Sequence, residues 1–224
     1  IVAGADNAGD VLVICGTTLI VWCVTSELAE VPGYFPMPHT TKGKFLVGGP
    51  SNAGGLFLDW ARRLLRDAEP ATDPDRVPVW VPYPRGERTP LNDSTRRAQL
   101  VDLDLTHGPA EVRRATFEAA GFVTRRTIEA SPTPARRIVA TGGGVRVDEW
   151  VQCLADCTGL PVDVVAVPEG AALGAAFLAR IAAGLETSTA DAARWARRAR
   201  TVEPDPAWVA AVSDRYARFL EVAS

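Results

Sequence analysis

The stretch RRIVATGGGVRVDEWVQCLADCTGLPVDVV, residues 136–165, contains three consecutive glycines with a strand pattern before them and a helix pattern after them. The apolar run from Ile138 to Thr141 predicts a buried strand, and the spacing from Asp148 to Cys157 predicts a helix before a second strand at Val162 to Val165. The glycines follow the first strand, where they favour either an unusual turn or the close approach of a ligand to the backbone.

The composition is that of an ordinary globular protein. With 224 residues, the chain is able to bury roughly 70% of its unfolded surface. The formal net charge of −3 gives no sign of a nucleic-acid or acidic-membrane partner. No apolar run approaches the roughly 20 residues that span a bilayer, so we expect no membrane segment.

The four cysteines and two histidines form no pattern typical of a disulfide scaffold or a zinc site. No C-x-x-C pair occurs, so no metal site is predicted, and Cys153 and Cys157 are expected to be small buried side chains. Free cysteines are typical of a reducing compartment, which predicts a cytoplasmic protein. The first residue is Ile1 rather than methionine, and we expect the chain to be part of a longer protein.

The first third of the chain predicts three strands and a helix. DVLVICGTT and LIVWCV read as two buried strands that meet at a tight turn, and KFLVGG reads as a third strand after a proline-containing loop. The next helix is expected to be capped by Ser51 or Asn52. Its apolar residues that recur at helical spacing are Leu56, Trp60, Leu64 and Leu65.

The rest of the chain alternates helix and strand. Residues 69–109 are rich in proline and arginine and predict an irregular insertion with one strand, followed by a long helix. After the glycine-containing unit come a helix from Ala171 to Ala183 and, from Thr187, two helical segments interrupted at Pro204 and Pro206. This order predicts an α/β protein with a mixed central sheet and helices on both faces. The initial strands argue against a plain doubly wound dinucleotide fold, which alternates from its start.

Three glycine-containing turns follow predicted strands, and together they predict a nucleotide site. In α/β folds ligands bind beyond the carboxyl ends of strands, where glycine lets them approach the backbone. Two of the turns lead into helix starts, whose free N–H groups favour phosphate, and hydroxyl groups of the first turn are further donors. A P-loop is excluded because no G-x-x-x-x-G-K-[ST] sequence occurs. The turns are Gly16-Thr17-Thr18, the segment from Gly48 to Gly55, and Gly142-Gly143-Gly144.

Several segments resemble the carboxyl-terminal half of the FGGY carbohydrate kinases. TGGGVRVDEWVQCLADCTGLPV and VPEGAALGAAFLA carry the resemblance, VWVPYPRGERTPLND is similar to the family's G-E-R-T-P segment, and VICGTT is similar to its second phosphate motif. The match runs in order from Ile1 to about Ala183. It implies the actin-like, ribonuclease-H-like ATPase fold and transfer of the ATP γ-phosphate to a hydroxyl of a sugar or polyol, xylulokinase-like, with ATP/ADP and Mg²⁺ as cofactors.

The resemblance also implies the residues of the nucleotide site. Thr17 matches the threonine whose hydroxyl approaches the phosphates, and Gly55 matches a glycine whose backbone approaches them. Gly143 matches the middle glycine against which the adenosine and its phosphates lie, so that a bulkier residue would fill the nucleotide's place. Arg146 occurs at the same place in xylulokinase-like members, whereas Val147 replaces an asparagine of glycerol kinases, which leaves base recognition open. The other residues assigned to this site are Gly16, Thr18, Asp59, Gly142 and Gly144.

The catalytic base is expected to lie outside this chain. In the family it is an aspartate roughly twenty residues before the glycine of the second phosphate motif, and counting back that far from Gly16 passes Ile1. Asp6 stands too close to that glycine and is expected to be a turn residue rather than the base. The resemblance does not include the amino-terminal domain, which carries most sugar contacts and the Mg²⁺ ligands, so we expect the chain to be inactive alone.

These matches divide the chain into a nucleotide-binding domain at 1–185, with the insertion at 69–109, and a helical extension at 186–224. The expected partners are the nucleotide, the sugar and the missing domain of the same protein, and an isolated half with an exposed interdomain face is also expected to form a homodimer. Arg85 to Thr89 form either part of the cleft rim or a loop fixed by local ion pairs. The basic run Arg194 to Arg200 is most simply a solvated helix face or a surface against another domain.

Two other interpretations stay open. A non-catalytic actin-like nucleotide-binding or scaffold domain would share the fold, and the residue at the expected upstream position would distinguish it, because an aspartate there supports the kinase. A different actin-like ATPase, such as an acetate kinase or hexokinase relative, is disfavoured by the G-E-R-T-P and PEGAALGAA segments.

Overall fold

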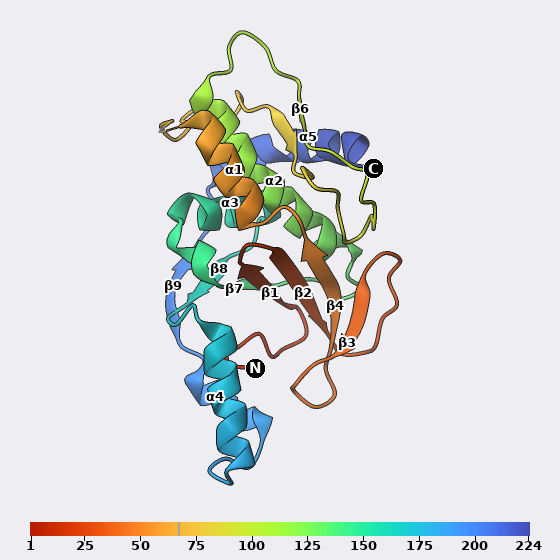
Figure 1. Cartoon of the computed structure of the whole chain (residues 1–224), viewed down its shortest axis with the longest axis vertical. Coiled ribbons are helices and arrows are strands. Elements are labelled where there is room, and N and C mark those ends of the chain that lie inside the picture. The colour runs from red at the N-terminus through yellow and green to blue at the C-terminus, as the bar shows by residue number, and fades with distance from the viewer. Residues whose placement is uncertain (67) are drawn as a thin grey trace.

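The centre of the molecule is a mixed seven-stranded sheet in the order β3-β4-β2-β1-β7-β8-β9, with a separate two-stranded sheet of β5 and β6 (Figure 1). The computed structural model describes residues 1–66 and 68–224. The strands of the large sheet are β1 (Asp10–Cys15), β2 (Leu19–Thr25), β3 (Phe35–Pro38), β4 (Phe45–Ser51), β7 (Arg137–Thr141), β8 (Val162–Val165) and β9 (Arg198–Val202), and those of the small sheet are β5 (Val79–Val81) and β6 (Gln99–Val101).

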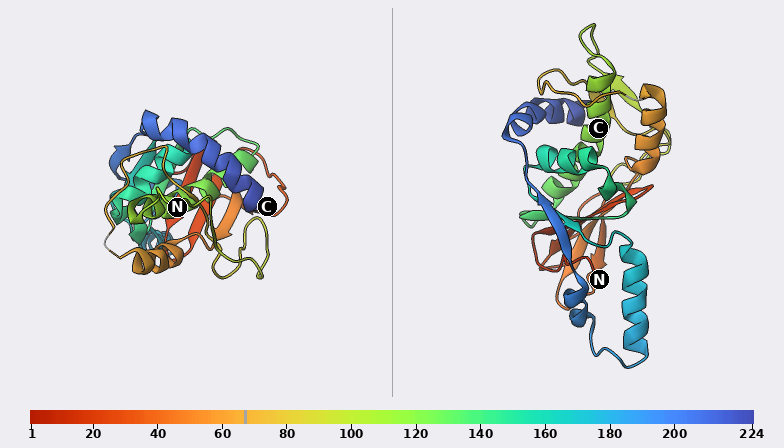
Figure 2. Two further views of the ribbon diagram at one scale, coloured as in Figure 1. Left: turned by 90° about the horizontal axis from the view of Figure 1, so that it is seen from above. Right: turned by 90° about the vertical axis from the view of Figure 1, so that its left-hand side faces the viewer.

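Helices cover both faces of the large sheet. Figures 1 and 2 show α1, α2, α3 and α5 on one side of the sheet and α4 on the other, which confirms the predicted arrangement. No helix of the described residues is long and apolar enough to cross a bilayer. The α-helices are α1 (Gly55–Leu65), α2 (Pro109–Ala130), α3 (Asp148–Thr158), α4 (Gly170–Ala182) and α5 (Pro206–Val222), and the short 3-10 helices are η1 (Gly143–Arg146) and η2 (Thr189–Trp195).

The pairing of β1 with β7 positions the glycine turns. β1 forms the predicted antiparallel hairpin with β2 and runs parallel to β7, with Ile14 opposite Thr141. Parallel neighbours end at the same edge of a sheet. The turn after β1 and the glycines after β7 therefore lie side by side, although more than a hundred residues separate them in the sequence.

Arg137 of β7 connects this strand to β1 and β8, at the ends of the strands opposite the glycine turns. Its guanidinium donates to Asp10 on β1 at 2.9 Å and to Asp163 on β8 at 2.8 Å. Burial acts to raise the pKa of both carboxyls, but the hydrogen bonds they accept outweigh it, and both pKa values lie below the ordinary value. The two aspartates therefore stay ionised and fix the register of three adjacent strands.

A buried ion-pair cluster holds three helices together on the covered face. Glu118 of α2 has no solvent exposure, and its two carboxylate oxygens accept from Arg215 of α5 at 2.8 Å each and from Arg114 at 2.9 Å. Arg114 also donates to Asp156 of α3 at 2.8 Å. Because charged groups this deep are costly unless every one is paired, the cluster fixes α2, α3 and α5 in one arrangement.

Strand β3 was not predicted, and its composition explains why. The strand contains Pro36 and Pro38, and all four of its residues are exposed. Proline removes a hydrogen-bond donor and is tolerated only where that side of the strand faces solvent. β3 pairs only with β4, at the edge of the sheet, so its prolines are compatible with its position.

The prediction of two helical segments after Thr187 was wrong for the first segment. There the chain forms the short helix η2 and then β9, which pairs antiparallel with β8, and only the last part is the helix α5. Side chains on β8 and β9 favour this pairing, because Asp163 accepts from Arg198 at 3.1 Å and from Thr201 at 2.6 Å. The basic run is thus partly an edge strand, and residues 186–224 are not a purely helical extension.

Replacing Glu118 with glutamine is expected to lower the free energy of unfolding by about 3 kcal/mol, because the buried Arg215 guanidinium loses its carboxylate partner and Arg114 keeps only Asp156. Urea unfolding followed by circular dichroism measures the change. The matched control is Glu221→Gln, which removes an exposed carboxylate that pairs with Arg218 and is expected to cost less than about 0.5 kcal/mol. Equal losses in the two variants would contradict a structural role for the buried cluster.

Candidate functional site

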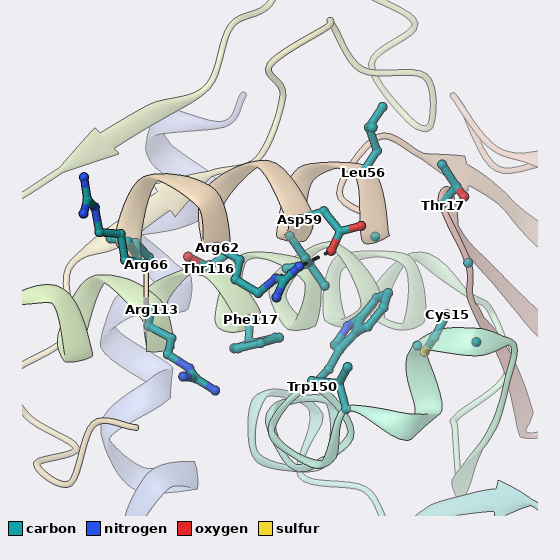
Figure 3. A pocket seen from close by; sticks show the side chains of 17 residues that line it. Cys15, Thr17, Leu56, Asp59, Arg62, Arg66, Arg113, Thr116, Phe117 and Trp150 are labelled. Atoms are coloured by element: carbon teal, nitrogen blue, oxygen red, sulfur yellow. Dashed lines mark ion pairs between the residues drawn. The ribbon is translucent and has the colours of Figure 1, made fainter. Parts of the chain in front are cut away.

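A cavity of about 640 Å³ lies at the edge of the sheet where β1 and β7 end, bounded by α1, α2 and the start of α3 (Figure 3). Figure 3 shows Cys15 and Thr17 at one end of this cavity and Arg66 and Arg113 at the other. Backbone-rich turns form the first end, which we call the glycine end, and it is lined by Cys15, Gly16, Thr17, Gly55, Gly143 and Gly144. The helices supply the second, largely apolar part, lined by Leu56, Leu58, Leu65, Phe117, Val147 and Trp150.

The start of α1 is docked on the turn between β1 and β2. The N–H groups of Gly55 and Leu56 donate to the carbonyl oxygens of Gly16 and Thr17 at 2.8 and 3.1 Å. A Cβ atom on Gly54 would lie 2.5 Å from the carbonyl carbon of Thr18, so only glycine permits this approach. The expectation that the first N–H groups of α1 are free for phosphate was therefore wrong, because the turn already uses them.

The predicted caps of α1 were also wrong. Ser51 is the last residue of β4 and its hydroxyl accepts from Ala53 N–H at 3.1 Å, whereas the residue in the N-cap position is Gly54. Asn52 faces a neighbouring loop, because its side-chain amide donates to the carbonyl oxygen of Gly86 at 2.8 Å. Both polar side chains shape the loop before the helix rather than its first turn.

The residues of α1 that line the cavity include both buried and exposed ones, such as Leu58 and Leu56. Phe57, Leu58 and Ala61 are the buried residues of this helix, whereas Leu56 and Leu64 are exposed. Of the apolar series predicted from the sequence, Trp60 and Leu65 pack against the core and the other two residues do not. An exposed apolar residue that lines a cavity, such as Leu56, is available to contact a ligand.

Different physical factors explain why glycine occupies each of the three positions after β7. Gly142 has a φ of +93°, and a Cβ there would lie 2.8 Å from the carbonyl oxygen of Cys15. A Cβ on Gly144 would overlap the Trp150 ring and would lie 2.8 Å from the same carbonyl oxygen. At Gly143 the nearest atom is the Arg146 guanidinium, 3.8 Å away. The fold thus requires the outer two glycines, whereas the middle one leaves space in the cavity.

Hydrogen-bond donors without protein partners gather at the glycine end. Within residues 1–66 and 68–224, no acceptor lies within hydrogen-bond distance of the N–H groups of Gly143 and Gly144 or of the Thr17 hydroxyl. Polar backbone groups that line a cavity are normally paired with protein, water or ligand. Three unused donors from two adjacent turns are suited to an anionic or oxygen-rich group.

Charged side chains line the wider part of the cavity, and two of its arginines form ion pairs. Asp59 lies 3.9 Å from Arg62 on the same helix, as the dashed line in Figure 3 shows. Arg113 of α2 pairs with Glu149 of α3 at 2.7 Å. These arginines therefore have carboxylate partners, and the apolar side chains between them form the surface on which a flat ring would pack.

The structure brings six of the nine predicted nucleotide-site residues to the cavity wall: Gly16, Thr17, Gly55, Asp59, Gly143 and Gly144. Thr18, Gly142 and Arg146 do not line it. The Thr18 hydroxyl accepts from Arg88 at 3.0 Å, and Arg146 pairs with Glu169 at 2.6 Å. Asp6 lies before β1, at the opposite end of a strand that spans about 20 Å, so it is remote from the cavity.

Sequence reasoning missed the helical wall of the cavity. Leu58, Arg62 and Leu65 recur at helical spacing on α1, and Arg113, Thr116 and Phe117 do so on α2. This spacing was readable in the sequence, but it does not tell which two helices face each other. The tertiary contact between α1 and α2 supplies that information.

No ready nucleophile or metal cluster accompanies this wall. Burial raises the pKa of the Cys15 thiol to about 12, so the thiol stays neutral. Among the residues that the structure describes, no group of three or more His, Cys, Asp or Glu side chains is arranged to hold a metal ion. The described part of the chain thus supplies binding groups for a ligand.

The G-E-R-T-P loop is anchored to the segment between β4 and α1, next to the glycine end. Glu87 is 2% exposed, and one of its carboxylate oxygens accepts from Asn52 N–H at 3.1 Å. Its other oxygen has no partner among the described residues. Burial raises the pKa of Glu87 to about 7, against the lowering effect of hydrogen bonds from Ser51 and Asn52. The loop is held by a carboxyl that ionises only near neutral pH.

Comparison with known proteins decides the family. The model of the FGGY family of carbohydrate kinases, C-terminal domain, matches residues 11–183. The chain therefore belongs to the FGGY family of carbohydrate kinases. The resemblance stated from the sequence motifs is thereby confirmed.

Relatives of this FGGY domain include kinases that are named for different substrates. The chain is 34% identical over 200 residues to the xylulose kinase of Escherichia coli (strain K12), an alignment that covers 83% of this chain and 41% of the relative. It is 34% identical over 191 residues to a glycerol kinase of Cereibacter sphaeroides (strain ATCC 17025 / ATH 2.4.3), covering 78% of this chain and 38% of the relative. The chain thus spans about two fifths of these relatives' length.

A solved structure shows the same fold. The ligand-bound xylulose kinase from Lactobacillus acidophilus superposes with a TM-score of 0.85 at 26% identity, over 97% of this chain and 47% of that one. The predicted actin-like ATPase fold is therefore confirmed, and the FGGY domain corresponds to about half of that structure.

Gly144→Ala is expected to destabilise the FGGY domain by about 2 kcal/mol, because the added methyl group overlaps the buried Trp150 ring and a backbone carbonyl. Gly143→Ala is the matched control, since its methyl group has open space, and it is expected to change stability by less than about 0.5 kcal/mol. Thermal unfolding measures both variants. If Gly143→Ala were the more destabilising of the two, the assignment of these glycines would be wrong.

Glu87→Gln is expected to change how stability depends on pH. A carboxyl whose pKa is raised on folding keeps its proton in the folded state while the unfolded state loses it, so the free energy of unfolding falls as pH rises from about 4.5 to about 7. In the parent this contribution amounts to about 2–3 kcal/mol, and the variant lacks it. Urea unfolding at pH 5 and pH 8 compares the two proteins, and parallel pH profiles would refute the raised pKa.

Proposed function

We propose that this chain is the ATP-binding half of a carbohydrate kinase that transfers the γ-phosphate of ATP to a hydroxyl of a sugar or polyol. The observation that carries the proposal is the cavity, in which unpartnered N–H and O–H donors lie at the glycine end and apolar side chains line the rest. A nucleotide has the same two parts, a phosphate chain and a flat base. The cavity volume of about 640 Å³ lies within the range of small-molecule sites.

We assign the cavity residues accordingly. The Thr17 hydroxyl and the N–H groups of Gly143 and Gly144 donate to the phosphate oxygens, and Gly16 and Gly55 allow the phosphate chain to approach the backbone. The base and ribose lie against the apolar wall, where the Asp59 carboxylate accepts from a ribose hydroxyl. The remaining assigned residues act from outside the wall: Thr18 and Gly142 shape the two turns, and Arg146 borders the base end.

The chain's own contribution to phosphoryl transfer is the binding and orientation of the nucleotide. Mg²⁺, bound with the nucleotide, supplies neutralisation of the phosphate charge; since the described residues form no metal cluster, we place its protein ligands in the missing half. The proton acceptor for the sugar hydroxyl lies there too, because Asp6 is remote from the cavity. We therefore propose that residues 1–185 form the nucleotide-binding domain of a cytoplasmic enzyme and that the chain alone is inactive.

The acceptor is proposed to be a ketose or polyol of the xylulose type. Xylulose kinases and glycerol kinases are both among the relatives, and the G-E-R-T-P segment and the arginine after the three glycines are the features that favour xylulokinase-like members. Most sugar contacts are assigned to the missing domain, which is also the proposed partner of this half. Without that domain, we propose that two copies associate with each other.

Gly143→Leu is expected to abolish binding of ADP in the presence of Mg²⁺, because the Cβ position has open space and the longer side chain would occupy the cavity. Calorimetric titration of the parent and the variant measures the change, with an affinity loss of at least about tenfold. Gly143→Ala is the graded control and is expected to bind ADP with a smaller loss. No binding of ADP by the folded parent would contradict the proposal for this chain.

A further inference from the structure

Arg88 connects the G-E-R-T-P loop to the turn between β1 and β2. Its guanidinium Nη2 donates to the Thr18 hydroxyl at 3.0 Å, and the side chain is exposed. Thr18 follows Thr17, which lines the glycine end of the cavity. The contact joins two segments seventy residues apart in the sequence, and the assignment of the cavity residues does not use it.

The residues on either side of Arg88 fix the direction of its side chain. Glu87 is buried and accepts from Asn52 N–H behind the loop. Thr89 is also buried, and its N–H donates to the Pro50 carbonyl oxygen at 3.2 Å. With its neighbours anchored inward, Arg88 projects outward over the turn.

Arg88 is a cation without an anionic partner at the end of the cavity where anions are expected. Within residues 1–66 and 68–224, no carboxylate forms an ion pair with Arg88, whereas Arg62, Arg113 and Arg146 around the cavity all have one. A guanidinium has five N–H donors in a fixed fork that suits phosphate oxygens. The bond to Thr18 uses one donor and leaves the others available.

The position of Arg88 relative to the expected phosphate chain indicates which ligand it would bind. The apolar wall and the glycine end order a nucleotide with its base between the helices and its phosphates toward Thr17. Arg88 contacts Thr18, which follows Thr17 on the turn, so we place its guanidinium next to the last group of the phosphate chain rather than the first. A nucleoside diphosphate ends one phosphate earlier than a triphosphate, so a cation at this position would meet only the group that differs.

We propose that Arg88 binds the terminal phosphate of the nucleoside triphosphate and makes this site distinguish a triphosphate from a diphosphate. This inference rests on the proposed nucleotide function. Arg88 holds the Thr18 hydroxyl with one N–H and the terminal phosphate with the others, which fixes the phosphate against the turn and toward the acceptor. The anchored loop around Glu87 and Thr89 is then the support that aims this side chain.

The test is calorimetric titration of the parent and Arg88→Gln with ADP and with the β,γ-imido analogue of ATP, both with Mg²⁺. The variant is expected to weaken binding of the triphosphate analogue about tenfold, as for the loss of one charge-assisted contact, and to weaken binding of ADP less than about twofold. Arg88→Lys, which keeps the charge without the planar fork, is expected to lie between them. Equal changes for both nucleotides, or no change, would overturn the proposal.

Two controls separate a direct contact from other causes. Arg85→Gln removes the same charge from an exposed residue of the same loop and is expected to leave both affinities unchanged; a triphosphate-specific loss in this variant would overturn the proposal in favour of long-range charge. Thr18→Val removes the bond to the turn but keeps the guanidinium, and it is expected to retain the discrimination. Failure of the parent to bind ADP removes the nucleotide function itself, whereas ADP binding without triphosphate discrimination removes only the role of Arg88.

Discussion

The site depends on a close backbone contact between the turn after β1 and the start of α1. Two hydrogen bonds, from Gly55 and Leu56 to the carbonyl oxygens of Gly16 and Thr17, replace the caps that a helix normally receives from side chains. The contact is available only because Gly54 carries no side chain. It fixes the first wall of the cavity, and it also means that the anion donors must come from elsewhere.

Those donors come from the neighbouring strand. β7 runs parallel to β1, and its glycines therefore face the same turn. Gly142 and Gly144 are packed against the end of β1 and the Trp150 ring, so the backbone at Gly143 is held in place without a side chain of its own. A rigid turn with unused N–H groups is preorganised for a charged ligand, which costs less binding free energy than ordering a flexible one.

Charge is used differently in the core and at the site. Glu118 and its two arginines are fully paired and hold the helices, and Arg137 with its two aspartates holds the strands. At the cavity the pairing is incomplete, because Arg88 has no carboxylate partner among the described residues and one oxygen of Glu87 is unpartnered. The exposed Arg88 guanidinium keeps N–H donors free for an anionic ligand, whereas Glu87 is buried behind the loop.

The sequence by itself predicted β1, β2, β4, β7 and β8 and the glycine turns after β1 and β7, because apolar strand runs, glycines and helix spacing are local signals. It also carried the family resemblance, which residues 11–183 then confirmed. The sequence did not predict β3 or β9. The proline-rich β3 forms a strand because it pairs with β4 at an open edge of the sheet. The arginine-rich β9 forms one because it pairs with β8, where Asp163 accepts from Arg198. Nor did the sequence give the pairing of α1 with α2 or the reach of Arg88 to Thr18, since contacts between segments seventy residues apart are set by packing rather than by any local pattern.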